Sequence, residues 1–404
     1  MATEIDRREF GRALTLAAAG VGLSAPAAQA AAPPRDAPFR VMPDLKVTRN
    51  DKIRTGGDYW IIVGTGGLTS KVSLEFFQRL NVRHLTAKGA SQLSATELSL
   101  TNRLGDFLAA DGPWDLDRLK RMQDDCGKAG MTMEGVRMDS AYIAMTPGPE
   151  RDRYLDIIRD NIRKAGQAGA KLVSYHWTIT PIRRNVRIPG RGGSTYAGFK
   201  LEPGWRDLPP TQAGKVSSED YWSRIDYFLK GVVPVAREAG IKLACHPYDP
   251  GGLPLGYMGV DQWDAGDFVA AMKRYELAYD DVHNGFTYET AVTGAALDDP
   301  NAQLPLLRYL SERGKIAQVH FRNIRGRRND AVETYIDEGD VNMLDCVRVL
   351  RDTGWEGSLL PDHVPDVEDN PVDPRKLTSY AYAFGYIEGL LRAAREEAIR
   401  ATRV

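Results

Sequence analysis

The chain alternates short apolar segments, typical of buried strands, with amphipathic segments, typical of helices, and the pattern repeats eight times. The predicted strands are 59–64, 82–86, 131–136, 171–176, 241–245, 282–288, 315–319 and 357–361. Between them, apolar side chains recur every three or four positions, as in 116–129 and 154–168. The repeats predict an α/β chain that folds as one TIM (β/α)8 barrel over residues 58–404.

The last four predicted strands each run into a side chain that can bind a metal ion. These side chains are His246, Glu289, His320 and Asp362. In a TIM barrel the C-terminal ends of all strands meet at one mouth, where active sites lie. Two imidazoles and two carboxylates suit a divalent ion, so we predict a metal centre for Mn²⁺ or Mg²⁺, with Co²⁺ and Zn²⁺ as alternatives.

Other side chains near these strand ends suggest acid–base chemistry and substrate binding. His363 follows Asp362 directly, and we predict that it is the general acid/base because imidazole titrates near neutral pH. Arg184, Arg322 and Tyr175 are predicted to hold anionic or hydroxyl groups of the substrate. For each arginine, a surface charge or a structural ion pair is the alternative.

Two further polar side chains and one long segment belong to the same predicted mouth. His176 ends the fourth predicted strand and Asn323 follows Arg322, so both are predicted to bind substrate, although Asn323 could instead cap a turn. The segment 178–215 is rich in Arg, Gly and Pro, and we expect it to form a lid rather than a disordered loop.

The N-terminus has the pattern of an export signal. Arg7 and Arg8 form a twin-arginine pair, followed by an apolar stretch over 13–25 and a small-residue cleavage site at 28–30. We predict a twin-arginine signal over 1–30, which exports the folded protein to the periplasm, and a linker or N-terminal wrap over 31–57. The alternative is a fortuitous arginine pair in front of an ordinary signal peptide. The apolar stretch is too short to span a membrane, so we expect no membrane span in the mature protein.

Charge and cysteine content restrict the partners. The formal net charge is -1, which argues against a nucleic acid or an anionic membrane as a partner. Three cysteines in an exported chain argue against a disulfide framework. We therefore expect a small-molecule substrate, with a homo-oligomer as an open possibility.

Five motifs resemble the mannonate dehydratase family, and the resemblance covers roughly residue 114 to the C-terminus. They are His-Pro-Tyr-Asp-Pro at 246–250, Asn-Gly-Phe-Thr at 284–287, Val-His-Phe-Arg-Asn at 319–323, Gly-Asp-Val-Asn-Met at 339–343 and Pro-Asp-His at 361–363. The resemblance implies a xylose-isomerase-like barrel, Mn²⁺, and removal of water across C2 and C3 of a hexonate. It also implies metal ligands at His246, His320 and Asp362, catalysis by His363, and a loop that carries Arg184.

The chain departs from the family pattern at four positions. Glu289 stands where the family has a cysteine ligand, which keeps a negative charge but changes a soft donor into a hard one. Leu360, Val364 and Ile336 stand where the family has Arg, Gly and His. The missing Arg and His leave fewer groups to recognise a substrate carboxylate.

Three functions therefore remain in competition. The first is a metal-dependent carbon–oxygen lyase, a dehydratase that acts on a sugar acid such as D-mannonate or on a related carbohydrate. The second is an isomerase, epimerase or β-eliminating lyase for a neutral keto-sugar or glycoside. The third is a periplasmic carbohydrate-binding protein without catalysis. A metal-dependent endonuclease is disfavoured by the neutral charge.

Overall fold

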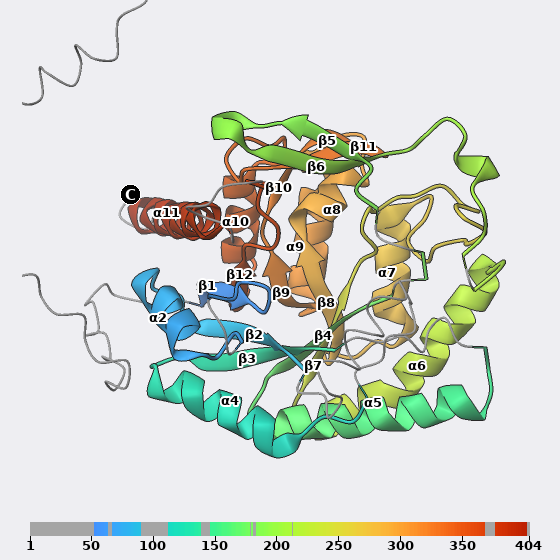
Figure 1. The fold of residues 1–404 in the computed structure, drawn as a ribbon, viewed down its shortest axis with the longest axis horizontal. Coiled ribbons are helices and arrows are strands. Elements are labelled where there is room, and N and C mark those ends of the chain that lie inside the picture. The colour runs from blue at the N-terminus through green and yellow to red at the C-terminus, as the bar shows by residue number, and fades with distance from the viewer. Residues whose placement is uncertain are drawn as a thin grey trace, which may run out of the picture. The chain divides into compact units, whose positions relative to one another are not determined.

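The computed structural model describes residues 52–63, 67–89, 112–138, 146–177, 179–180, 183–211, 213–367 and 376–401. The predicted signal over 1–30 and most of the predicted linker lie outside these residues. The labels used below are those of Figure 1.

Parallel strands form a closed barrel. Within the described residues, eight strands pair in the order β1-β12-β9-β8-β7-β4-β3-β2 (Figure 1). They are β1 (Ile53–Asp58), β2 (His84–Lys88), β3 (Thr132–Arg137), β4 (Leu172–His176), β7 (Lys242–His246), β8 (Asn284–Glu289), β9 (Ile316–His320) and β12 (Gly357–Leu360). Every neighbouring pair is parallel, which confirms the predicted TIM barrel.

The first predicted strand is wrong. The chain enters the barrel at β1, Ile53–Asp58, and residues 59–63, the described part of the predicted strand 59–64, lie after it. Gly56 and Gly57 lower the strand propensity of β1, but both are required there. A Cβ on Gly56 would lie 2.8 Å from the Cβ of Ser358, and one on Gly57 would lie 2.6 Å from the ring of Phe77. Residues 53–57, predicted as linker, therefore belong to the barrel, and Asp58 becomes a strand-end residue.

Helices pack around the barrel and bury one apolar face each. They are α2 (Lys71–Arg79), α4 (Leu116–Lys128), α5 (Pro149–Gln167), α6 (Ser218–Glu238), α7 (Phe268–Ala278), α8 (Thr290–Ala295), α9 (Leu304–Glu312), α10 (Met343–Asp352) and α11 (Leu377–Ala401), with short 3-10 turns at Arg191–Gly193, Trp205–Asp207 and Pro300–Gln303. In α4, for example, Leu119 and Cys126 are buried, as their spacing predicts. No helix among the described residues combines the length and apolarity needed to cross a bilayer.

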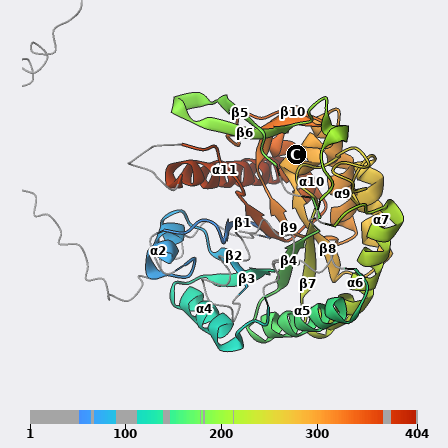
Figure 2. The ribbon, with the colours of Figure 1, turned by 45° about the vertical axis from the view of Figure 1, so that its right-hand side comes forward.

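A second, antiparallel sheet forms from the long segment after β4 and from the segment after β9. Its order is β10-β11-β6-β5, with β5 (Val186–Pro189), β6 (Thr195–Lys200), β10 (Asn323–Arg327) and β11 (Asp330–Thr334). Because β10 begins three residues after the end of β9, this sheet lies on the C-terminal side of the barrel (Figure 2). Much of the predicted lid segment 178–215 is thus an ordered hairpin beside the mouth.

Gly285→Ala should destabilise the barrel. A Cβ at this position in β8 would lie 2.5 Å from the carbonyl oxygen of Lys315. Overpacking of this kind lowers the free energy of unfolding by about 1–3 kcal/mol. The matched control is Gly389→Ala in α11, where a Cβ meets no heavy atom within 4 Å and alanine is the better helix former. Urea unfolding followed by circular dichroism should separate the two variants, and equal midpoints would contradict the packing argument.

Candidate metal centre and active site

Three of the four predicted metal ligands converge at the barrel mouth. His246 ends β7, His320 ends β9, and Asp362 follows β12 by two residues. Their ligand atoms all lie within 4.8 Å of one another, and the three residues are 3%, 5% and 2% exposed. The parallel strands end at the same level, so side chains far apart in sequence meet in one buried cluster.

The two imidazoles are oriented by acceptors outside this cluster. Nδ1 of His246 lies 2.6 Å from the carbonyl oxygen of Pro247, so Nδ1 carries the proton and Nε2 keeps its lone pair. His320 is turned the other way, with Nε2 3.1 Å from Asp58 Oδ2 and Nδ1 3.5 Å from Asp362 Oδ1. Each ring therefore has one nitrogen next to an acceptor and the other available to a metal, as in known metal sites.

The donor atoms of the site fit a divalent cation. Nδ1 of His320 and Oδ1 of Asp362 are buried without a hydrogen-bond partner. Buried polar atoms in this state are costly and rare in folded proteins. Imidazole nitrogen and carboxylate oxygen are the donors that Mn²⁺, Co²⁺ and Zn²⁺ accept in proteins. The cluster formed by His246, His320 and Asp362 therefore has the chemistry of a metal site.

Glu289 ends β8 as predicted but does not join the three-residue cluster. Its Oε2 accepts a hydrogen bond from the backbone N–H of Val292 and so caps α8. Its Oε1 lies 3.1 Å from Nε of Arg322. Burial raises the pKa of Glu289 to about 7, although Arg322 opposes this shift. This geometry does not support Glu289 as a fourth protein ligand.

Arg322 lies at the centre of the site and is 3% exposed. Its guanidinium contacts four carboxylates, with distances of 2.9 Å to Asp362, 2.8 Å to Glu333, 2.9 Å to Asp249 and 3.1 Å to Glu289. Burial lowers the pKa of Arg322, but the carboxylates outweigh it and raise that pKa well above its ordinary value. A buried charge is tolerated when partners surround it in this way.

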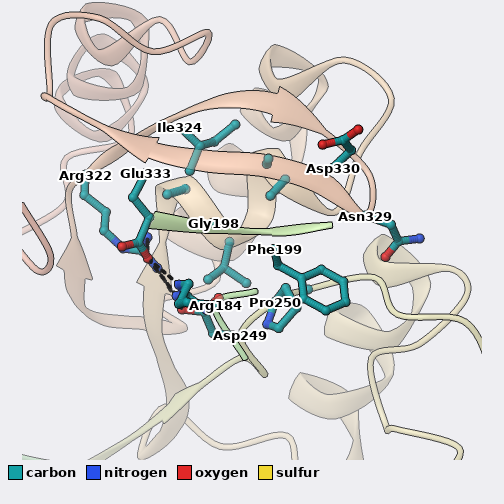
Figure 3. A pocket seen from close by; sticks show the side chains of 15 residues that line it. Arg184, Gly198, Phe199, Asp249, Pro250, Arg322, Ile324, Asn329, Asp330 and Glu333 are labelled. Atoms are coloured by element: carbon teal, nitrogen blue, oxygen red, sulfur yellow. Dashed lines mark hydrogen bonds and ion pairs between the residues drawn. The ribbon is translucent and has the colours of Figure 1, made fainter. Parts of the chain in front are cut away.

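Arg184 contacts two of these four carboxylates, those of Asp249 and Glu333 (Figure 3). Its Nε donates to Glu333 Oε1 at 3.0 Å, and its Nη2 donates to Asp249. The two predicted arginines thus lie in the site, and both are paired with carboxylates. A cavity of about 30 Å³ borders this pair, with Phe199 among the residues that line it, and it is large enough for ordered water.

His363 lies beside the cluster with its side chain 36% exposed. Its Nδ1 is 3.0 Å from Glu333 Oε1, and its Nε2 is 3.7 Å from Asp362 Oδ2. Burial opposes the charge on His363, but the two carboxylates outweigh it and raise its pKa to about 9. His176 lies in the site too, because its ring stacks on that of His246 with 4.1 Å between centroids. Both histidines are therefore placed where the strand pattern predicts them.

The prediction for Tyr175 is wrong. Its hydroxyl lies 2.6 Å from that of Tyr275 in α7, and its ring packs on Phe228 in α6. Neighbouring residues of a strand point to opposite faces, so His176 faces the barrel interior while Tyr175 faces the helices. The hydroxyl of Tyr175 is fully buried in that layer and cannot hold a substrate.

The prediction that Asn323 binds substrate is also wrong. Its amide donates to the carbonyl oxygens of Ile336 and Val341 at 2.9 and 3.0 Å. Its side-chain oxygen accepts from the backbone N–H groups of Ile324 and Val341. The alternative of a turn cap is the one that the structure supports.

Three acidic residues of the site were not predicted as site residues. Asp58 ends the strand that the apolar pattern misplaced, and Asp249 lies in the motif that begins at His246. Glu333 comes from β11 of the antiparallel sheet, and no local pattern marks it. Asp249, Glu333 and His363 also bring ligand atoms within 4.8 Å of one another. The guanidinium groups of Arg184 and Arg322 already neutralise the two carboxylates of this second group, so it does not need a metal ion for charge balance.

Comparison with known sequences finds similarity to mannonate dehydratases. The family model of D-mannonate dehydratase matches residues 211–401. The mannonate dehydratase of Streptococcus pneumoniae (strain 70585) is 28% identical over 314 residues, which is 69% of this chain and 83% of that protein. The enzyme of Streptococcus suis (strain 05ZYH33) is 29% identical over the same shares of the two chains.

Comparison with solved structures agrees on the fold. The mannonate dehydratase from Streptococcus suis serotype 2 superposes with a TM-score of 0.68 and 24% identity, over 86% of this chain and 96% of that chain. A xylose isomerase domain protein from Alicyclobacillus acidocaldarius superposes with a TM-score of 0.54 and 13% identity, over 85% and 99%. The barrel is therefore of the xylose-isomerase-like kind.

Arg322→Ala should destabilise the metal-free protein strongly, because it leaves four carboxylates of one buried site without their shared cation. Removal of one partner from a buried ionic network costs about 3–5 kcal/mol. The control is Arg328→Ala, since Arg328 is 43% exposed and its ion pair with Asp298 spans 3.6 Å. Surface pairs contribute at most about 1 kcal/mol. Chemical denaturation in the presence of EDTA measures both, and a small loss for Arg322→Ala would contradict its central role.

Proposed function

We propose that this chain, which is similar to mannonate dehydratases, is a divalent-metal-dependent carbon–oxygen lyase that removes water from a sugar acid such as D-mannonate. The observation that carries this proposal is the buried cluster of His246, His320 and Asp362 next to His363. A binding protein without catalysis has no need for an acid–base group beside a metal cluster.

His246, His320 and Asp362 would hold the metal, and its chemistry would be to polarise a carboxylate and a neighbouring hydroxyl oxygen of the substrate. Their donors are two nitrogens and carboxylate oxygens, which suit Mn²⁺. We propose Mn²⁺ as the resident ion on this basis. Since the cluster takes three protein side chains, coordination positions stay open for substrate oxygens.

His363 would act as the general acid that protonates the departing hydroxyl oxygen, while a base takes the proton from the neighbouring carbon. In the metal-free protein, burial opposes the charge, but Asp362 and Glu333 raise the pKa of His363 to about 9, which favours the protonated imidazole. Glu333 holds its Nδ1, and a carboxylate with a strongly lowered pKa is well suited to orient an imidazolium rather than to take its proton. A proton on Nε2 would therefore be the one available for transfer.

Export through the twin-arginine pathway belongs to the proposal as well. The arginine pair and the apolar stretch that follows it are features of the sequence alone. The twin-arginine pathway carries folded proteins, so an enzyme of this kind would be loaded with its metal before it reaches the periplasm. Localisation of a tagged full-length chain, with Arg7 and Arg8 both changed to lysine as the control, tests this part of the proposal.

A neutral substrate is the second candidate, and the pairing of the arginines favours it. Arg184 and Arg322 are both engaged by carboxylates, and Leu360 occupies the position where the family has an arginine. Five acidic side chains lie in or beside the site, namely Asp58, Asp249, Glu289, Glu333 and Asp362. Because these carboxylates already neutralise the arginines, few cationic groups of the protein are left for a substrate carboxylate, so an isomerase or epimerase acting on a keto-sugar is the alternative reaction.

Metal removal should abolish activity and restored metal should recover it. We expect EDTA-treated protein to be inactive on D-mannonate and Mn²⁺ to restore formation of a product lighter by one water, seen by mass spectrometry. His246→Ala should lower both Mn²⁺ affinity and turnover, because it removes one of the three clustered donors. A panel of sugar acids and keto-sugars, run in parallel, discriminates the two candidates. An isomeric product from a keto-sugar with no dehydration of any acid would replace the first candidate by the second.

His363→Gln should separate chemistry from metal binding. The loss of a general acid slows a reaction by about 10²–10⁴-fold. Mn²⁺ affinity should stay close to that of the parent, since His363 lies outside the cluster of three ligands. Steady-state kinetics and a calorimetric Mn²⁺ titration measure the two effects. Turnover within a few fold of the parent would show that His363 is not the acid.

A further inference from the structure

We propose that Asp58 is a positioning residue for the metal centre, which fixes the orientation and proton position of His320. The proposal rests on the metal site put forward above and adds a residue from a strand that carries none of the metal ligands. Asp58 ends β1, and its Oδ2 lies 3.1 Å from Nε2 of His320. Nδ1 of the same ring lies 3.5 Å from Asp362 Oδ1, inside the cluster.

Asp58 is held rigidly enough to orient a ring. The residue is 1% exposed, and its Oδ1 accepts a hydrogen bond from the backbone N–H of Tyr59 at 2.6 Å. The second oxygen, Oδ2, has no hydrogen-bond partner and lies 3.1 Å from Nε2 of His320. A carboxylate in this position attracts the N–H of the ring, so the proton stays on Nε2 and the lone pair of Nδ1 points toward the metal.

His246 shows the same arrangement with a different acceptor. Its Nδ1 faces the carbonyl oxygen of Pro247, which leaves Nε2 for the metal. The two ligand histidines would thus bind through different nitrogens, and each choice is set by the acceptor on the far side of the ring. The difference between the acceptors is charge, because Asp58 offers a carboxylate where Pro247 offers a neutral carbonyl. A carboxylate makes the imidazole a stronger donor.

Removal of such an acceptor weakens metal binding by about 10–100-fold. We expect this loss of Mn²⁺ affinity for Asp58→Ala in the full chain, measured by calorimetry and by the electron paramagnetic resonance signal of free Mn²⁺. Asp58→Asn keeps an oxygen acceptor but removes the charge, so its affinity should fall between those of the parent and Asp58→Ala. The visible spectrum of the Co²⁺-loaded protein should change in Asp58→Ala, because the ring can then rotate or shift its proton.

Asp264→Asn is the matched control. Asp264 is also a fully buried acid, and its Oδ2 accepts from the backbone N–H of Tyr248 at 2.9 Å. Burial raises the pKa of Asp264 to about 8, so asparagine replaces a side chain that is already neutral at pH 7. Mn²⁺ affinity and the Co²⁺ spectrum should match those of the parent. Circular dichroism of each metal-free variant establishes that it is folded.

The outcomes distinguish a failure of the positioning role of Asp58 from a failure of the proposed function. A parent protein that binds Mn²⁺, with His246→Ala weakened, supports the metal centre, and the ratio of the Asp58 variants to the parent then tests the positioning role. Affinity within twofold of the parent in folded Asp58→Ala would overturn that role and leave the metal centre intact. An equal loss in Asp264→Asn would overturn it too, because the effect would be general to buried acids. A parent with no saturable Mn²⁺ binding would overturn both.

Discussion

The site depends on one buried guanidinium. Arg322 contacts carboxylates from four separate segments, which follow β7, end β8, lie in β11 and follow β12. Its own charge would be costly to bury alone, and so would each of theirs. Because these groups neutralise one another, the acidic side chains can come close together in a region that is shielded from water. Without that cation, the four carboxylates could not lie so close together in a buried site.

The antiparallel sheet completes this arrangement from outside the barrel. Glu333 lies in β11 and reaches Arg322, Arg184 and His363 with a single carboxylate oxygen. The sheet thereby links the segment that carries Arg184 to the barrel mouth, and it orients the one imidazole to which we give an acid–base role. The ion pairs thus have two consequences, since they hold the sheet at the mouth and they set the pKa of His363.

The sequence was a good guide wherever a strand had a clear apolar pattern. Seven of the eight predicted strands overlap observed ones, and His176, His246, His320, Asp362 and His363 all lie in the site. The errors have local causes. The two glycines of β1 weaken its strand pattern, so neither this strand nor Asp58 at its end was predicted. In β4, Tyr175 and His176 are neighbours and point to opposite faces, so only one of them can reach the mouth. Asn323 was ambiguous by itself, because an amide caps a turn as readily as it binds a hydroxyl.

The sequence by itself determined the barrel and the level at which its metal-binding side chains end, because periodicity and strand ends are local properties of the chain. The tertiary structure alone decided which of those side chains meet. Glu289 ends its strand as His320 does, but it lies outside the cluster of three ligands. One of its carboxylate oxygens caps α8 and the other contacts Arg322. Glu333 and Asp58 enter the site through contacts between distant segments. Pairing of buried charges is a property of the whole fold, and no local pattern encodes it.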